Sequence, residues 1–218
     1  MTIVCKKLIK SFGEPANEII KGIDLEIKNG EFMSISGRSG SGKSTLLYLL
    51  STLDTPSSGI ITIDDQEPDK LSVEELHKFR NQHLGFVFQF HYLLPELTAL
   101  ENALLPARKN GNQDEISVFV NELFENFDVN STKNKLPSQL SGGEQQRVAI
   151  IRALSMKPRY LFADEPTGNL DSVNGKIVMD ILRKANSDWG MTLVLVTHEE
   201  DYAKMAETEI FLKDGLII

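Results

Sequence analysis

Eight residues near the start of the chain have the types and spacing of a phosphate-binding loop. Residues 37–44 read GRSGSGKS and fit the pattern G-x-x-x-x-G-K-[ST] at every fixed position. Gly37, Gly40 and Gly42 lack a Cβ atom, so the backbone can turn through positive φ and point its N–H groups at an anion. We expect Lys43 to reach the β- and γ-phosphates and the Ser44 hydroxyl to bind Mg²⁺. A glycine-rich turn without a ligand is the alternative, and the full match disfavours it.

Two adjacent acids end a hydrophobic run later in the chain. Residues 160–163 read YLFA, as expected for a parallel strand buried on both faces, and Asp164 and Glu165 follow. Ligands of parallel sheets bind beyond the carboxyl ends of the strands. We therefore expect Asp164 to hold Mg²⁺ opposite Ser44 and Glu165 to orient and deprotonate a water molecule. A solvated turn at the strand end is the alternative.

Two further polar residues follow predicted strands at the same edge. Gln89 ends the short strand of residues 85–88, and His198 follows the buried run of residues 192–196. Gln89 could contact Mg²⁺ or the attacking water, and His198 could donate a hydrogen bond to a γ-phosphate. For His198 alone, a structural place near a helix start would be the better interpretation.

A second helix start has the features of an anion site. Residues 140–144 read LSGGE, in which Ser141 and Glu144 form a capping box and Gly142 and Gly143 expose backbone N–H groups. This start has its own glycines, so it is not expected to fill the same space as residues 37–44. It could instead serve the nucleotide of another chain. An ordinary helix cap is the alternative.

The composition limits the class of protein. The 218 residues carry 23 basic and 31 acidic side chains, a formal charge of −8, which argues against a nucleic-acid partner. The single cysteine, Cys5, leaves no basis for disulfides or a structural zinc site. No stretch approaches the ~18 apolar residues of a membrane span, so a membrane process would need spans from another chain.

Strands that alternate with helices predict an α/β fold with a parallel sheet. Strands are expected at residues 2–10, 18–28, 60–63 and 209–212 in addition to those above, with a hairpin turn at Asn29-Gly30. Helices are expected after Ser72, after Thr98 as far as Pro106, and over residues 113–127, 141–155 and 171–185. Trp189 is expected in a loop.

With these motifs in order, the sequence resembles the ATP-binding-cassette ATPases over nearly its whole length. The resemblance rests on GRSGSGKST at residues 37–45, Gln89, LSGGEQQ at 140–146, YLFADE at 160–165, Asn169-Leu170-Asp171 and His198. It implies a head-to-tail dimer with two ATP molecules, each between the phosphate loop of one chain and the LSGGEQQ helix of the other. Phe12 takes the place of an adenine-stacking aromatic that is commonly tyrosine.

The resemblance also implies a role for each matched residue. Nucleotide binding is implied for Phe12, Gly37, Arg38, Ser39, Gly40, Ser41, Gly42, Lys43, Ser44, Thr45, Ser141, Gly142, Gly143 and Asp171. Catalysis is implied for Glu165, His198 and Gln89, and Mg²⁺ binding for Ser44, Gln89 and Asp164. The implied cofactors are ATP and Mg²⁺.

The implied fold is a P-loop NTPase core with a mainly parallel sheet, an N-terminal antiparallel β part and an inserted α-helical subdomain. Residues 1–218 would form one nucleotide-binding domain, with the ATPase core at 1–89 and 158–218 and the helical subdomain at 90–157.

A finer resemblance lies around residues 80–102 and 163–172. The stretch ADEPTGNLDS resembles a branch that serves lipoprotein-releasing complexes, macrolide and peptide exporters and the cell-division cassette. Within that branch, RNQHLGFVFQFHYLLPELTALEN is most similar to the lipoprotein-releasing ATPase. Residues 90–94 would then contact integral membrane subunits, with packing inside the subdomain as the alternative. The implied location is peripheral, on the cytoplasmic side of the bacterial inner membrane.

Three other functions stay open. The chain could drive a macrolide or antimicrobial-peptide exporter or a cell-division complex. It could be a regulatory nucleotide-binding scaffold, which the presence of Glu165 and His198 disfavours. It could also be a cassette ATPase of DNA repair or translation, which the acidic charge and the lack of zinc modules and coiled-coil inserts disfavour.

Overall fold

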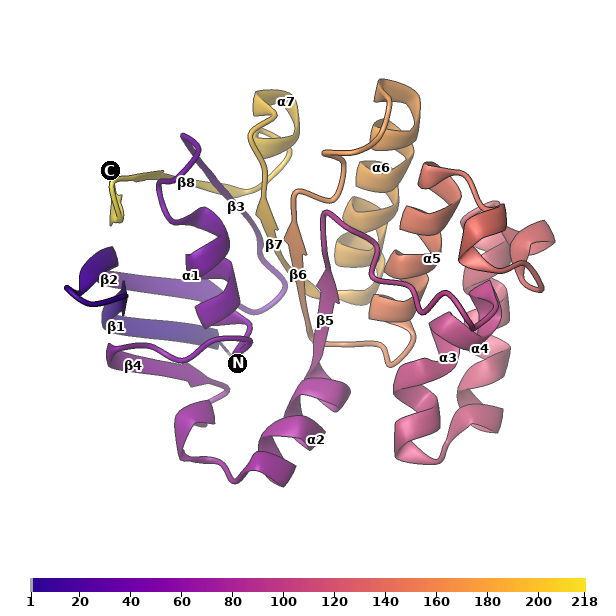
Figure 1. Ribbon diagram of the computed structural model, residues 1–218, viewed down its shortest axis with the longest axis horizontal. Helices are drawn as coiled ribbons and strands as arrows, with labels where there is room; N and C mark the ends of the chain where they lie inside the picture. Colours follow the sequence, from indigo (N-terminus) through magenta and orange to yellow (C-terminus); the bar gives the residue numbers. More distant parts are fainter. Residues whose placement is uncertain (1) are drawn as a thin grey trace.

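Residues 2–218, which the structure describes, fold around two β-sheets in this computed structural model (Figure 1). The smaller sheet is antiparallel, in the order β2-β1-β4, and consists of β1 (Thr2–Phe12), β2 (Asn17–Lys28) and β4 (Ser58–Ile63). The larger sheet has the order β5-β6-β7-β3-β8-β9. Its strands are β3 (Phe32–Gly37), β5 (Leu84–Val87), β6 (Tyr160–Asp164), β7 (Thr192–Val196), β8 (Thr208–Lys213) and β9 (Leu216–Ile217).

The larger sheet is parallel except at β9, which pairs antiparallel with β8. Its register brings several strand ends to one edge. Val196 lies opposite both Asp164 of β6 and Ile35 of β3, and Ala163 lies opposite Val87 of β5. The residues that follow these strands therefore meet at the carboxyl edge of the sheet, as the sequence predicts.

The helices pack on both sides of this sheet. They are α1 (Lys43–Leu50), α2 (Val73–His83), α3 (Ala99–Asn110), α4 (Gln113–Asn126), α5 (Gly142–Leu154), α6 (Ser172–Trp189) and α7 (Glu200–Ala203), with 3₁₀ turns at Pro68–Lys70, Asn130–Thr132 and Pro137–Gln139. Figure 1 shows α1 beside the antiparallel sheet, while α3, α4 and α5 gather at the opposite end of the molecule. The expected α/β fold, with its antiparallel part and its helical region, is confirmed.

Helix α1 lies between the two sheets and anchors the phosphate loop. Its Leu46, Leu47, Leu49 and Leu50 are fully buried, in one cluster with side chains of β1, β2, β3 and β6. Each such side chain contributes about 1.5–3 kcal/mol through burial of its apolar surface. The helix that follows the loop is thereby held by the core on two sides.

Capping boxes begin three of the helices, as predicted. At α2, the Ser72 hydroxyl accepts from the Glu75 N–H and the Glu75 carboxylate accepts from the Ser72 N–H. The same reciprocal pair forms between Thr98 and Glu101 at α3. Each satisfies N–H groups that the first helical turn leaves without a partner.

Three local predictions were wrong. The turn at Asn29-Gly30 does not close a hairpin, because β2 and β3 belong to different sheets. Helix α3 continues past Pro106 to Asn110, held by the buried Ala103 and Ala107. Trp189 is the last residue of α6, and its ring packs against Phe119 with a centroid distance of 5.6 Å. In each case tertiary structure decides the local conformation: the partition of strands between two sheets, the packing of the α3 alanines, and the contact of Trp189 with Phe119.

None of the helices within residues 2–218 is long and apolar enough to cross a bilayer. The division at residues 90 and 157 stays a prediction. Helix α5 belongs to the expected subdomain, yet it also packs against β5 and α6.

Candidate active site

The phosphate loop joins β3 to α1 and depends on two closely packed glycines. Gly37 has φ 145°, and a Cβ atom there would stand 2.2 Å from the Leu212 carbonyl oxygen. Gly42 has φ 103° and begins α1, where a Cβ would meet Ile19 and Ile20 at 3.0–3.3 Å. Only glycine fits these positions without a shift of backbone. The loop backbone is thus held against β2 and β8.

The side chains of the loop and of α1 are arranged around its backbone. The Lys43 ammonium donates to the carbonyl oxygens of Gly37 and Arg38 at 2.9 and 3.2 Å. The Ser41 N–H donates to the same Arg38 carbonyl at 3.2 Å, and the Ser41 side chain is buried. The Ser44 hydroxyl donates to the Asp164 carboxylate at 3.0 Å. The structure therefore joins the loop to the first of the two predicted acids.

Glu165 and His198 contact each other at the end of the neighbouring strands. The Nδ1 atom of His198 hydrogen-bonds the Oε2 atom of Glu165. The backbone of Glu165 has φ 48° and donates its N–H to the Val196 carbonyl at 2.9 Å. A non-glycine residue in this region of φ is uncommon, and such residues cluster at functional sites. The Glu165 side chain is thus directed toward His198.

A cavity of about 780 Å³ collects most of these groups. Its lining consists of Ile19, Ser39, Gly40, Gly42, Lys43, Ser44, Thr45, Gln89, Asp164, Glu165 and His198. Gln89 is linked to the segment after β6, because its carbonyl accepts from the Asn169 side-chain amide at 3.0 Å. The structure thus brings predicted residues from four separate stretches of chain to one cavity.

Phe12 lies at the end of β1, beside the cavity rather than in its lining. Its ring is 49% exposed, and its cross-strand partner Asn17 is two residues from Ile19, which does line the cavity. The Lys10 ammonium lies 4.9 Å from the ring centroid. That ammonium is fixed by Asp54 at 2.7 Å. One face of the Phe12 ring is therefore packed against a cation.

The second predicted anion site lies elsewhere. Ser141 caps α5 in a capping box with Glu144, and Ser141 and Gly142 are exposed. The Glu144 carboxylate accepts from the backbone N–H of Ser141, and this bond lowers its pKa. Figure 1 shows α5 and α1 on opposite sides of β6 and β7. Ser141, Gly142 and Gly143 are thus separate from this chain's own phosphate loop.

Asp171 lies next to that helix start. Its carboxylate caps α6 by accepting from the N–H groups of Val173 and Asn174, and the bond to Asn174 lowers its pKa. A Cβ atom on Gly143 would stand 2.5 Å from the Asn174 side-chain oxygen. The starts of α5 and α6 therefore lie side by side, with Gly143 packed against Asn174 and with Ser141 and Asp171 exposed.

Sequence analysis did not predict two residues that lie at or near the cavity. Ile19 lines the cavity from β2, which no motif indicates. Tyr48 lies one helical turn after Ser44, and its phenol faces Asp164. Burial, and then the Asp164 carboxylate, raise the pKa of Tyr48 to about 12. The spacing of four residues on one helix could have shown that Ser44 and Tyr48 share a face.

The donor set at Ser44 and Asp164 fits Mg²⁺. A hydroxyl and a carboxylate lie 3.0 Å apart, and Mg²⁺ is commonly held by one or two such oxygens together with phosphates and water. Within residues 2–218, no group of three or more His, Cys, Asp or Glu side chains is placed to hold a metal ion. The site therefore suits a metal that arrives with a nucleotide.

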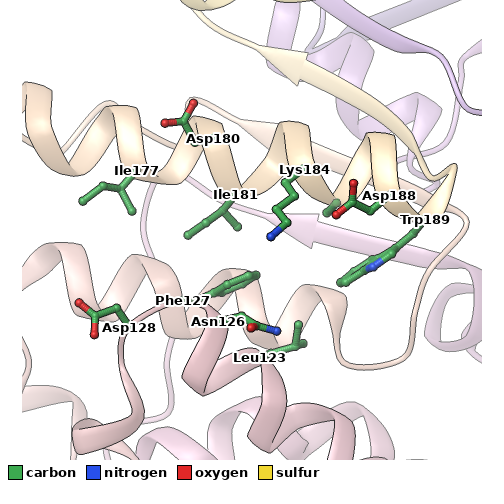
Figure 2. Close-up of a pocket in the computed structure, with 11 residues that line it drawn as sticks. Leu123, Asn126, Phe127, Asp128, Ile177, Asp180, Ile181, Lys184, Asp188 and Trp189 are labelled. Carbon is green, nitrogen blue, oxygen red and sulfur yellow. The ribbon is translucent and has the colours of Figure 1, made fainter.

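A separate cavity of about 530 Å³ lies between α4 and α6 (Figure 2). Figure 2 shows Ile177, Ile181 and Lys184 of α6 facing Phe127 and Leu123 across it, with Trp189 at one end. None of the predicted site residues lines this cavity. The phosphate loop and the strand-end acids line the other cavity.

Comparison with known proteins agrees with this geometry. Residues 20–168 match the ABC transporter family. A relative from Leptospira interrogans serogroup Icterohaemorrhagiae serovar Lai, the "Lipoprotein-releasing system ATP-binding protein LolD", is 52% identical over 97% of this chain and 88% of the relative. The protein of that name from Aquifex aeolicus is 50% identical over 98% of this chain and 93% of the relative.

A solved structure is similar along the whole fold. It is the dimeric, post-hydrolysis state of the ATP-binding cassette MJ0796 bound to ADP and Pi, with a TM-score of 0.89 and 40% identity. The match covers 99% of this chain and 96% of that chain. From the family match, these relatives and the groups gathered at the phosphate loop, we conclude that the chain belongs to the ABC transporter family, as one of its ATP-hydrolysing cassettes.

Proposed function

We propose that this chain is the ATP-hydrolysing subunit of an ABC transporter that releases lipoproteins from the inner membrane towards the outer membrane. The site at the phosphate loop supports the chemistry. The cargo is supported by the relatives named for a lipoprotein-releasing system, one of them 52% identical over 97% of this chain. The hydrogen bond from Ser44 to Asp164, with Glu165 beside it, is the observation that carries the proposal.

Different residues of the chain have different roles in hydrolysis. Lys43 and the loop N–H groups bind the β- and γ-phosphates and stabilise charge on the transferring phosphoryl group. Ser44, Asp164 and Gln89 would hold Mg²⁺, which would supply further positive charge for phosphoryl transfer. Glu165 accepts a proton from water as the water oxygen bonds to the γ-phosphorus and the bond to ADP breaks. His198 donates its Nδ1–H to the Glu165 carboxylate, and its Nε2–H, present in the doubly protonated ring, would donate to the γ-phosphate.

Two copies of the chain complete each site. Ser141, Gly142, Gly143 and Asp171 do not line the cavity of their own chain. Ser141, Gly142 and Asp171 are exposed, and Gly143 is buried directly behind them. The similar cassette MJ0796 was solved as a dimer with ADP and Pi. In a head-to-tail dimer, this surface would meet the γ-phosphate that the partner's loop holds, and Phe12 would stack on the adenine.

The surface at residues 90–94 is the proposed contact with integral membrane subunits, on the cytoplasmic side of the membrane. Phe90, Tyr92 and Leu94 are 60%, 63% and 42% exposed. Three large apolar side chains within five residues are typical of an interaction site. We call residues 90–94 the docking segment.

The test of the function is purification of the chain with its membrane subunits. Incorporated into vesicles that carry an acylated protein, the complex should release that protein on addition of ATP, and the ATPase rate should change on assembly. Export of a macrolide or a peptide without release of the acylated protein would assign the chain to the exporter branch. An assembled complex without ATPase activity would favour the scaffold role.

A matched pair of variants tests the docking segment. Phe90→Ser with Tyr92→Ser should abolish co-purification of the membrane subunits and leave ATP binding by the isolated chain intact. Val118→Ser, at a 64% exposed position on α4, is the control and should assemble normally. Loss of ATP binding in the double variant, with assembly preserved, would contradict the assignment.

A further inference from the structure

The main chain of the docking segment is held from two directions. At its end, Asn102 of α3 accepts from the Leu94 N–H at 2.7 Å and donates to the Leu94 carbonyl at 3.1 Å. In its middle, the Arg152 guanidinium donates to the His91 and Tyr92 carbonyls at 2.8 and 2.6 Å. These bonds leave the side chains of Phe90, Tyr92 and Leu94 free to meet a partner.

Arg152 directs its charged group to this segment alone. Among residues 2–218, no carboxylate lies within ion-pair distance of it. Burial lowers the pKa of Arg152. The hydrogen bonds to the two carbonyls offset part of the free-energy cost of removing the guanidinium from water. A planar guanidinium presents its donors in a fixed fork, so it can hold successive carbonyls in one geometry. Tyr92 has φ 45°, a conformation that such external contacts have to maintain.

Arg152 lies in the last turn of the helix that begins at Ser141. The eleven residue steps from Ser141 to Arg152 span roughly 17 Å at 1.5 Å per residue. The body of α5 is well packed, with Val148, Ile150 and Ile151 fully buried. Helix α5 therefore connects two places. Its N-terminal end carries the exposed Ser141 and Gly142, and Arg152, near its C-terminal end, contacts the docking segment.

We propose that Arg152 is a positioning residue that couples docking of the membrane subunits to the orientation of α5. Because the start of α5 completes the partner's site in the dimer, this orientation in turn affects hydrolysis there. The inference rests on the proposed function, because it needs a partner at the docking segment. A partner that shifts the backbone of His91 and Tyr92 shifts the end of α5 through the guanidinium fork. Coupling between two sites requires such a contact, whose free energy differs between the two states.

The test compares Arg152→Met, which removes every donor, with Arg152→Lys, which retains a charge that can reach one carbonyl. Arg183→Met, at an exposed position on α6, is the control for the same substitution elsewhere. In the isolated chain, hydrogen exchange of the amides in residues 90–94 should become faster in Arg152→Met and stay unchanged in Arg183→Met. Unchanged exchange in Arg152→Met would show that the guanidinium does not hold the segment.

The second measurement is the ratio of the ATPase rate with the co-purified membrane subunits to the rate of the isolated chain. Arg152→Met should assemble, and the change in rate on assembly should shrink by roughly fivefold or more, the lower end of typical allosteric coupling. Arg152→Lys should recover part of the change, which a general loss of stability would not allow. If Arg152→Met fails to fold or assemble, Arg152→Lys decides: its ratio of assembled to isolated rate should be smaller than that of the wild type, and an unchanged ratio would overturn the proposal.

The outcomes separate the two proposals. If assembly does not change the wild-type rate, the proposed function fails. If assembly changes the wild-type rate and the Arg152 variants respond as the wild type does, only the coupling role of Arg152 is overturned.

Discussion

At the scale of single residues, Glu165 shows how the fold prepares a base for water. Its positive φ turns the chain sharply after β6, and its N–H remains bonded to the Val196 carbonyl. The carboxylate is then free to meet His198, while Asp164, one residue earlier, faces Ser44. Two adjacent acids thus point to different partners, which allows one to hold a metal and the other to activate water.

Replacing Glu165 with Gln should reduce the ATPase rate by about 10²–10⁴, the usual contribution of general-base catalysis. The amide keeps the shape of the side chain but cannot accept the proton of water. ATP binding, measured with a fluorescent analogue, should stay close to that of the wild type. A Glu165→Gln chain that hydrolyses ATP at the normal rate would place the base elsewhere.

The glycines of the phosphate loop should differ in their tolerance to alanine. Gly37→Ala forces a Cβ against the Leu212 carbonyl, so we expect a loss of at least about 3 kcal/mol from overpacking and positive φ together. Gly40 has φ 78° and open space around it, so Gly40→Ala should lose only about 1–2 kcal/mol from backbone strain. Urea unfolding of the two variants measures the difference. Equal losses would contradict the close packing at Gly37.

Residue patterns in the sequence predicted most of the groups that line the cavity. The phosphate loop and the strand-end acids have fixed spacings that the chemistry itself requires. Ile19 could not be predicted in this way, because it reaches the cavity only through packing of β2 against the loop. The hydrogen bond from Asn169 to the Gln89 carbonyl was also missed, since it depends on how two loops fold together.

At the scale of elements, two histidines next to helices should make the stability depend on pH. His83 ends α2, and burial followed by the Arg159 charge lowers its pKa. His91, in the docking segment, has its pKa lowered by burial and by Arg152. The folded state therefore favours the neutral rings, and the unfolded chain binds more protons below about pH 6.5. The contribution of the two neutral rings to the free energy of unfolding is fully present above that pH. It is lost as the pH drops toward the lowered pKa values of the folded state.

His91→Gln should reduce this loss of stability. Urea unfolding at about pH 7.5 and about pH 5.5 gives the difference in the free energy of unfolding between the two conditions. That difference should be smaller in His91→Gln than in the wild type. His77→Gln, at an exposed position on α2, controls for the loss of a histidine as such. An identical pH dependence in all three proteins would rule out the effect.

Elements with strong local signals were predicted well, and elements set by tertiary contacts were not. The capping boxes at Ser72, Thr98 and Ser141 each begin a helix where expected. The end of α3 was misjudged, because packing of its buried alanines outweighs the break that Pro106 normally causes.

At the scale of the whole molecule, the groups that could act on ATP lie on two separated surfaces. The cavity at the phosphate loop holds Lys43, Asp164 and Glu165. The starts of α5 and α6 present Ser141 and Asp171 on another surface, on the other side of β6 and β7 (Figure 1). The α/β architecture could be predicted from alternating strands and helices, whereas the separation of the surfaces needed the three-dimensional arrangement. A head-to-tail pair of chains would bring the two surfaces together.

The most direct measurement of this arrangement is the ATPase rate of mixed dimers. Lys43→Ala removes the phosphate-loop charge, and Ser141→Arg blocks the start of α5, so each variant alone should be inactive. Mixing differently tagged chains of the two variants should restore roughly a quarter of the wild-type rate, because half of the dimers are mixed and each has one intact site. A chain that carries both substitutions, mixed with the wild type, should have no intact site in its mixed dimers. A mixture of the single variants that forms mixed dimers yet stays inactive, or full activity of Ser141→Arg alone, would contradict the shared site.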